Sequence, residues 1–511
     1  MIFRPPSLAP QSLALGARLS LAVGALLLAL GVPAPTGASA QARDRLVIGM
    51  HLEPPHLDPT AGAAAAIDEV TYANLFESLT RIDARGEVIP GLAESWQVSP
   101  DGLTYTFKLR ANVRYHDGTG FDAADVKFAL DRARGPDSVN AQKAYFAAIA
   151  SVETPDPLTV IVGLSRPDGQ FLFNMGSNDA AIVAPESAAT NKQKPIGTGP
   201  FKFDRWVSGD RVVLARNPDF RDPTVPKLRE VVFRFISDPA AQLNAMRSGD
   251  VDAFPNIGAT ETLPVLEADK NFVVTVGTTE GETVLALNNA RKPFDDVRVR
   301  RALAFAVNRQ DVIDGAMFGY GTPIGSHFAP HRAGYVDLTG MYPHDPAKAR
   351  ALLAEAGYPN GIDAVIKLPP PIYARRGGEI IAAQLAEVGV RLRIEPMEWA
   401  PWLEQVFKGR DFDMTIISHV EPLDIDIYNR PDYYFGYHGD RFAAVMDKLS
   451  RAIEPDARAA LYGDAQRIIA EDSVNVFLFQ LPKAGVHRAG LTGLWENSPV
   501  PANDVTAVSW K

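Results

Sequence analysis

One stretch of the chain gathers the residue types that could do chemistry: SHVEPLDIDIYNRPDYYFGY, at residues 418–437. It holds four acids, one histidine, one arginine and five aromatic residues, and it follows the apolar run FDMTII. Carboxylates there could act as catalytic acids, hold a metal or pair an ammonium group, while aromatic faces attract cations or cover apolar groups. The alternative is a solvated acidic loop whose aromatic residues pack as core. The candidate residues are His419, Glu421, Asp424, Tyr433 and Tyr434, with Trp399 and Trp402 one element upstream in MEWAPWLEQ.

A second candidate is Arg375, which precedes a predicted helix in PPPIYARRGGE. An arginine in a cleft could hold a carboxylate through two parallel hydrogen bonds. The alternative is an arginine that only faces solvent.

Motifs of known catalytic chemistry are missing from the sequence. It contains no G-x-S-x-G, no H-E-x-x-H, no phosphate-binding loop and no dinucleotide fingerprint. His327 and His331 form H-x-x-x-H, but Pro330 between them favours a loop over a metal-binding helix. We therefore assign no catalytic residue, no metal site and no cofactor, and we predict that the protein is not an enzyme.

The elements that must position these residues are strands and helices in alternation. In LTYTFKLR (103–110) apolar and polar residues alternate strictly, as expected of a strand with one buried face. FVVTVG (272–277) is richer in apolar residues and predicts a buried strand. SDPAAQLNAMRSGD and HDPAKARALLAEAGYP each place Asp at a helix N-cap, Pro in the first turn and Gly just past the end. GGEIIAAQLAEVGVRLRIEPMEW (377–399) reads as a helix, a turn and a strand, so we expect an α/β protein with mixed sheets.

The 511 residues exceed what one core normally holds, so two or three domains are expected. Breaks near residues 286–294 and 481–490 suggest two crossovers at one interface, which would make a hinge. The net charge of −10 argues against a nucleic-acid partner.

The first 40 residues read as a signal peptide. Arg4 and Arg18 precede an apolar stretch at 19–32, and Ala38-Ser39-Ala40 fits a cleavage site. No cysteine follows, so we expect a protein without a lipid anchor, free in the periplasm or, in a source that has no outer membrane, in the medium.

Several longer segments resemble the extracellular solute-binding proteins of family 5, the peptide- and nickel-binding receptors of ABC importers. They occur in the family's order and span nearly all of the mature chain. These segments are DGLTYTFKLRANVRYHDGTGFDAADVKFALDR (101–132), IGTGPFKF (196–203), RSGDVDAF (247–254), FDDVRVRRALAFAVNRQDVI (294–313) and YPHDPAKARALLAEAGYPNG (342–361).

The resemblance implies a two-lobed periplasmic-binding-protein fold with a hinge and three domains. After the signal peptide (1–40), residues 41–76, 196–286 and 483–511 would form the core domain of lobe I. Residues 77–195 would form its inserted second domain, and 287–482 would form lobe II. The protein would be a monomer that captures a small peptide-like solute between its lobes and delivers it to a membrane ABC permease.

The resemblance also implies roles within the opening stretch. Peptide-binding relatives carry Asp-x-x-Asp-Pro after a strand of the second lobe, and Glu421-Pro422-Leu423-Asp424 occupies that place. Glu421 would then pair the solute's ammonium group, and Asp424 would be the structural second acid. The departures from the family pattern, a longer first acid and Pro422, leave peptide specificity open. His419 lies where nickel-binding relatives use a histidine, which keeps a chelated-metal receptor as an alternative; a secreted hydrolase or chaperone on the same scaffold is another.

Overall fold

The structure, a computed structural model, describes residues 43–62, 64–257 and 260–511. The predicted signal peptide therefore lies outside the described residues. Among the helices of the described part, none is long and apolar enough to cross a membrane.

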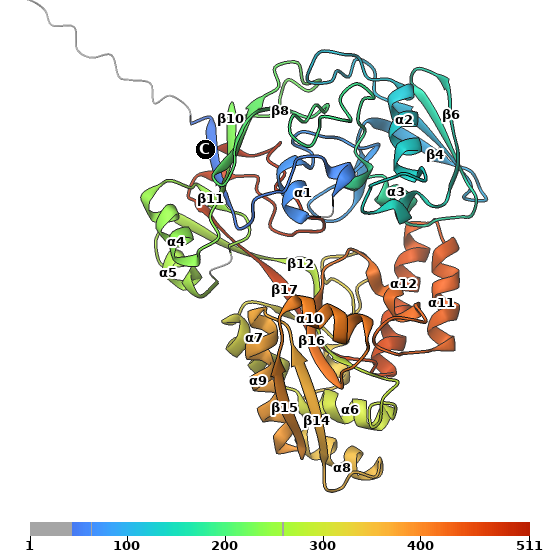
Figure 1. Cartoon of the computed structure of the whole chain (residues 1–511), viewed down its shortest axis with the longest axis vertical. Coiled ribbons are helices and arrows are strands. Elements are labelled where there is room, and N and C mark those ends of the chain that lie inside the picture. The colour runs from blue at the N-terminus through green and yellow to red at the C-terminus, as the bar shows by residue number, and fades with distance from the viewer. Residues whose placement is uncertain (1–42, 63, 258–259) are drawn as a thin grey trace, which may run out of the picture. The chain divides into compact units, whose positions relative to one another are not determined.

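A mixed sheet of 11 strands organises residues 44–511 (Figure 1). Parallel and antiparallel pairs both occur, as the sequence predicts: β14 pairs β15 in parallel, whereas β12 and β17 are antiparallel. The strand order is β15 (Val390–Pro396), β14 (Ile362–Leu368), β16 (Met414–His419), β12 (Phe272–Leu287), β17 (Val476–Arg488), β11 (Ala253–Phe254), β1 (Arg45–Met50), β10 (Glu230–Phe235), β9 (Arg211–Arg216) and β8 (Phe201–Val207), with β13 (Thr322–Pro323) also on β17.

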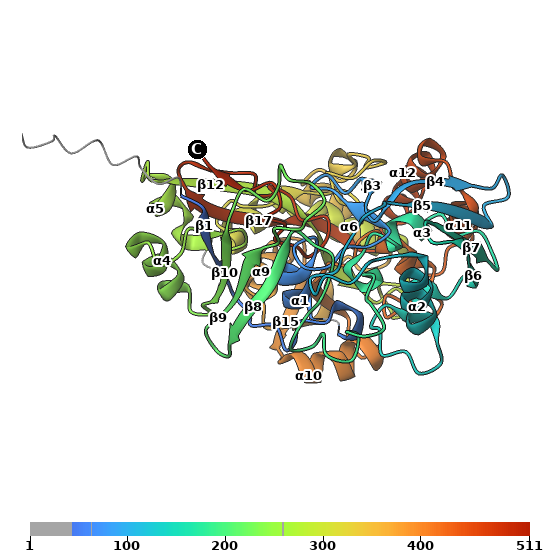
Figure 2. The ribbon, with the colours of Figure 1, turned by 90° about the horizontal axis from the view of Figure 1, so that it is seen from above.

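The long strands β12 and β17 connect the two halves of this sheet and lie side by side in Figures 1 and 2. Only the second half of β12, from Glu282, also pairs with β16. The expectation that 272–277 is buried is wrong in part, because Val273 and Val276 are 40% and 41% exposed in the half that pairs with β17 alone.

A separate antiparallel sheet of four strands lies between residues 93 and 164, and α2 packs against it. The strict alternation predicted for 103–110 is confirmed, since Tyr105, Phe107 and Leu109 are buried. This sheet has the order β4 (Ala93–Val98), β5 (Thr104–Leu109), β7 (Thr159–Leu164) and β6 (Ile149–Asp156).

Helix boundaries follow local capping chemistry. Asp238 accepts a hydrogen bond from the N–H of Ala241, Pro239 opens α4, and Gly249 ends it at φ 89°, a left-handed value that suits glycine. Asp345 caps α8 in the same way. The helices are α1 (Ala65–Thr71), α2 (Ala123–Arg134), α3 (Phe171–Asn174), α4 (Pro239–Ser248), α5 (Leu263–Glu267), α6 (Val297–Ala306), α7 (Arg309–Met317), α8 (Pro346–Glu355), α9 (Ile372–Glu387), α10 (Trp399–Trp402), α11 (Asp440–Arg451) and α12 (Pro455–Glu471).

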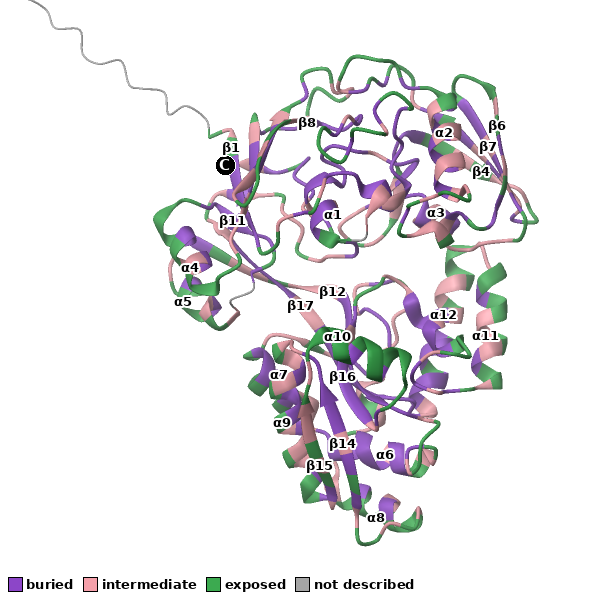
Figure 3. Cartoon of the chain, viewed as in Figure 1, coloured by how far each residue is buried: buried purple, intermediate pink, exposed green. Residues whose placement is uncertain are grey.

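The buried apolar residues form several clusters. One lies within 79–184 around the four-stranded sheet, others join 46–272 with 484–508, and two more lie within 284–479. Figure 3 shows β14 and β16 largely buried and much of α10 exposed. The domain boundaries themselves remain a prediction.

Candidate functional site

The opening stretch begins where a buried strand ends. β16 carries apolar side chains into the core up to His419, and the chain then turns. Leu423 adopts a left-handed backbone (φ 58°) and leads into a 3₁₀ turn at Asp424–Asn429. A leucine in this conformation is unusual, so the surrounding packing holds the turn in a fixed shape.

Behind this turn lies a buried group of acids and imidazoles. The Nε2 of His327 donates to Oδ1 of Asp424 at 2.8 Å, and the Tyr428 hydroxyl lies 3.2 Å from Nδ1 of the same ring. Oε2 of Glu282, on β12, lies 3.9 Å from His327 Nε2. Asn475 donates to the Tyr428 hydroxyl. Four distant segments thus bring their polar groups together in the core.

The two buried acids differ in their electrostatics. Burial, together with the nearby charges of Asp424 and Glu280, raises the pKa of Glu282 well above its usual value. Burial alone would raise the pKa of Asp424, but the charge and hydrogen bond of His327 lower it below its usual value. Asp424 is therefore ionised at neutral pH, and Glu282 favours its protonated form.

His419 is engaged by tyrosines. Its Nε2 lies 3.1 Å from the Tyr434 hydroxyl, and its Nδ1 lies 3.3 Å from the Tyr433 hydroxyl. Burial lowers its pKa to about 4, although Asp424 acts in the opposite direction. The ring is therefore neutral at pH 7, with both nitrogens near partners.

Glu421 is the exposed acid of the segment. Its carboxylate accepts a hydrogen bond from the N–H of the adjacent Val420 at 3.2 Å, and its side chain is open to solvent. Among the acids predicted from the sequence, Glu421 is therefore the one whose carboxylate is accessible to a positively charged group of a solute.

The other predicted contact residues divide by burial. Trp399 is 42% exposed and Tyr433 is half-buried, whereas Trp402 and Tyr434 are core residues that pack edge to face. Arg375 lies on α9 and donates a hydrogen bond to Glu398 at 3.0 Å. Its acidic partner is therefore not one of the acids of the segment 418–437. Their contact with a solute stays a prediction.

A cavity of about 450 Å³ reaches this segment, with Leu423 in its wall. Its size suits a small solute. Residues from distant parts of the chain line it, among them Trp96, Phe173, Ile453, Arg458 and Tyr462. Gln170 donates to the Tyr462 hydroxyl at 3.1 Å across the same region.

Carboxylates from residues 44–195 and from the segment 418–437 act on Tyr145. Burial is the largest cause that raises the pKa of Tyr145 to about 12, and the charges of Asp179, Glu421, Asp424 and Asp68 add to it. Burial also raises the pKa of Asp179 to about 7, and burial with Asp179 raises that of Asp68 well above its usual value. Carboxyl groups of residues 44–195 and of 418–437 therefore act on the same tyrosine hydroxyl.

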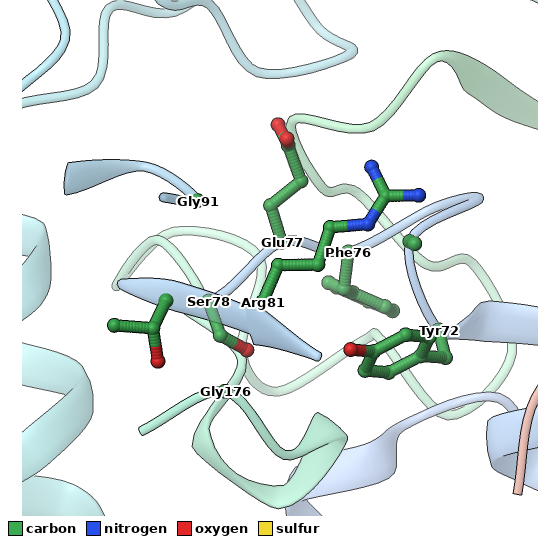
Figure 4. Close-up of a pocket in the computed structure, with 9 residues that line it drawn as sticks. Tyr72, Phe76, Glu77, Ser78, Arg81, Gly91 and Gly176 are labelled. Atoms are coloured by element: carbon green, nitrogen blue, oxygen red, sulfur yellow. The ribbon is translucent and has the colours of Figure 1, made fainter. Parts of the chain in front are cut away.

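A second hollow, drawn in Figure 4, is too small for a solute. Its volume of about 20 Å³ has room for about one water molecule. Its charged residues are already paired, Arg81 with Asp504 and Glu77 with Arg221.

Comparison with solved structures shows that this chain has the two-lobed fold of periplasmic binding proteins. The periplasmic binding protein DppA from Helicobacter pylori in complex with the peptide STSA is 27% identical, with a TM-score of 0.74, and the match covers 92% of this chain and 98% of that one. HbpA2 from Haemophilus parasuis is 25% identical with a TM-score of 0.83, covering 91% and 100%.

The family follows from sequence comparison. The model of the family described as "Bacterial extracellular solute-binding proteins, family 5 Middle" matches residues 87–439. The glutathione-binding protein GsiB of Escherichia coli O1:K1 is 30% identical over 498 residues, covering 92% of this chain and 95% of that protein. The chain belongs to the bacterial extracellular solute-binding proteins of family 5, the substrate-binding proteins of ABC importers.

Sequence reasoning missed several residues of this region. His327 lies in a loop, as the sequence predicts, but nothing in the sequence signals its buried partners Asp424 and Tyr428. Glu282 lies in a strand without any motif. Asp68, Asp179 and Tyr145 likewise carry no local signal, because only the fold brings them near the segment 418–437. The acidic and aromatic composition of that segment was the one usable signal.

Proposed function

We propose that this receptor binds a small solute that carries a positively charged amine, such as a short peptide, and passes it unchanged to a membrane ABC permease. The observation that carries the proposal is that carboxyl groups from both regions of the chain act on Tyr145. An ammonium group there would favour the ionised forms of Asp68 and Asp179, whose pKa values burial raises. The 450 Å³ cavity with its aromatic wall accepts the rest of the solute.

Within this proposal Glu421 is the ammonium partner, because it is exposed and its carboxylate has spare acceptor capacity. Tyr433 and Trp399 would supply aromatic surface, since both keep part of their rings accessible. Asp424 holds the turn through His327. A solute that touches both regions shifts the protein toward its closed form, because only differential contact moves such an equilibrium.

The proposal further includes export by the signal peptide, a periplasmic location, a monomeric state and no chemical change in the solute. Native mass spectrometry of the purified mature protein would identify retained cargo and its mass. Incubation of the same protein with that cargo should return the cargo intact; breakdown would instead support the hydrolase alternative.

The role of Glu421 is tested by calorimetry with the identified cargo. Glu421→Gln should weaken binding at least about tenfold, as expected when one partner of a buried charge pair is removed. Asp432→Asn is the matched control, because Asp432 is an exposed acid of the same segment that pairs with Arg410. Equal affinities of the wild type and Glu421→Gln would remove Glu421 from the site.

A further inference from the structure

The buried group at Glu282, His327 and Asp424 has the composition of a metal site. One ligand atom from each residue lies within 4.8 Å of the others. Imidazole nitrogen with two carboxylate oxygens is a donor set that suits divalent transition metals. The residues come from β12, from the loop after β13 and from the turn after β16, so the fold assembles the group.

An unpartnered atom points to a missing ligand. Oε2 of Glu282 is buried and has no hydrogen-bond partner within the described part of the chain, and the Glu282 side chain is 4% exposed. Buried carboxylate oxygens normally have partners, because an unsatisfied one costs free energy. This oxygen faces His327 Nε2 at 3.9 Å. Two ligands of one zinc ion lie at about 3.3 Å from each other, given metal–ligand distances near 2.0–2.1 Å. Glu282 therefore has to move inward, and the His327–Asp424 pair, now hydrogen-bonded at 2.8 Å, has to open by a similar amount to admit the ion.

The surroundings orient the imidazole as metal sites require. With a metal on Nε2, His327 carries its proton on Nδ1, where the Tyr428 oxygen at 3.2 Å can accept it. Asn475 donates to the same oxygen and fixes its position. Such outer partners set the tautomer and ring orientation of ligating histidines. Asp424 directly follows Leu423, which lies in the wall of the 450 Å³ cavity.

We propose that Glu282, His327 and Asp424 bind one divalent transition-metal ion, such as Zn²⁺. The ion takes three ligands from the chain itself and leaves a position open for water or a solute atom. This site differs from the predicted role of His419 toward a metal–chelator complex, because here the chain itself supplies the ligands. It does not depend on the identity of the solute.

The test uses the untagged mature protein, stripped with a chelator and titrated with Zn²⁺ and, in a parallel sample, with Co²⁺. We expect one tight ion per chain and a Co²⁺ absorption spectrum of a low-coordinate N/O site. Glu282→Gln and His327→Gln should each weaken Zn²⁺ binding at least about tenfold. His438→Gln, which alters an exposed histidine elsewhere, should bind as the wild type does.

Circular dichroism and thermal unfolding of each variant check that it folds. The proposal is overturned if the wild type shows no saturable one-to-one binding. It is also overturned if Co²⁺ gives only the weak bands of a hydrated ion, a readout that needs no variant. Unchanged Zn²⁺ affinity in both folded variants would place any bound ion elsewhere.

Discussion

At the scale of single residues, two acids three positions apart have opposite surroundings. Glu421 is exposed and contacts one neighbouring N–H, whereas Asp424 is buried and holds His327 at 2.8 Å. The first is available to a solute, and the second stabilises the turn that presents it. Substitutions at the two positions should therefore separate solute binding from stability.

Replacement of Asp424 by alanine should lower the free energy of unfolding by about 1–3 kcal/mol, because the buried His327 loses its acceptor. The matched change Glu421→Ala should alter stability by less than about 0.5 kcal/mol, as is usual for exposed positions. Urea unfolding of the apo-proteins measures both. Equal losses at the two sites would show that Asp424 does not support the turn.

Asp179 gives the stability of the apo-protein a dependence on pH. Burial raises its pKa to about 7 from a usual value of 3.8, so the folded state holds a proton that the unfolded state releases. Its contribution is complete below about pH 4 and is lost as pH rises through 7. The groups facing it are Asp68, Tyr145 and Arg132, and none of them is removed by the test.

The variant Asp179→Asn should therefore lose less thermal stability than the wild type between pH 5 and pH 8. Scanning calorimetry of both proteins in the same buffers provides the comparison. Parallel curves would contradict a raised pKa at this position.

At the scale of elements, local chemistry explains what the sequence could predict. Caps such as Asp238 with Gly249, and the alternation of Tyr105, Phe107 and Leu109, act within a few residues and are visible in the sequence. The exposed half of β12 was missed, because apolar composition does not reveal which strands will flank it. His327 was missed for the same reason, since its partners lie about 97 residues away along the chain.

The cap of α4 gives an element-scale prediction. Asp238→Ala should lower the free energy of unfolding by about 1 kcal/mol, since the N–H of Ala241 loses its acceptor. Asp250→Ala, just beyond the other end of α4, is the control and should change it by less than about 0.5 kcal/mol. Denaturant unfolding measures both changes. An unchanged free energy of unfolding in Asp238→Ala would show that the cap contributes nothing.

At the scale of the whole molecule, Arg332 joins distant segments. It donates to Glu280 of β12 at 3.0 Å, to the carbonyl oxygen of Gly86 at 3.1 Å and to that of Pro499 at 3.0 Å. Its guanidinium lies 4.9 Å from the centre of the Phe173 ring. One buried side chain thus links the long strand, the region before β3 (Val88–Pro90) and the C-terminal segment.

Arg332→Met should cost about 3–5 kcal/mol of unfolding free energy, because Glu280 is left buried without its guanidinium partner. Adding Glu280→Gln should restore part of the loss by removing a buried charge that then keeps only His331, at 2.7 Å, as a partner. Arg467→Met, which breaks an exposed pair with Asp464, is the control and should cost less than about 1 kcal/mol. If the double variant is no more stable than Arg332→Met alone, the ion pair is not what Arg332 contributes.

The central claim is that acids from two regions of the chain, Glu421 among them, select a solute by its positive amine. The most direct measurement is calorimetry of the cargo-free mature protein with short peptides and with the same peptides acetylated at the N-terminus. We predict that acetylation weakens binding at least about tenfold, since it removes the charge that Glu421 and its neighbours oppose. Equal affinity for free and acetylated peptides would contradict the claim.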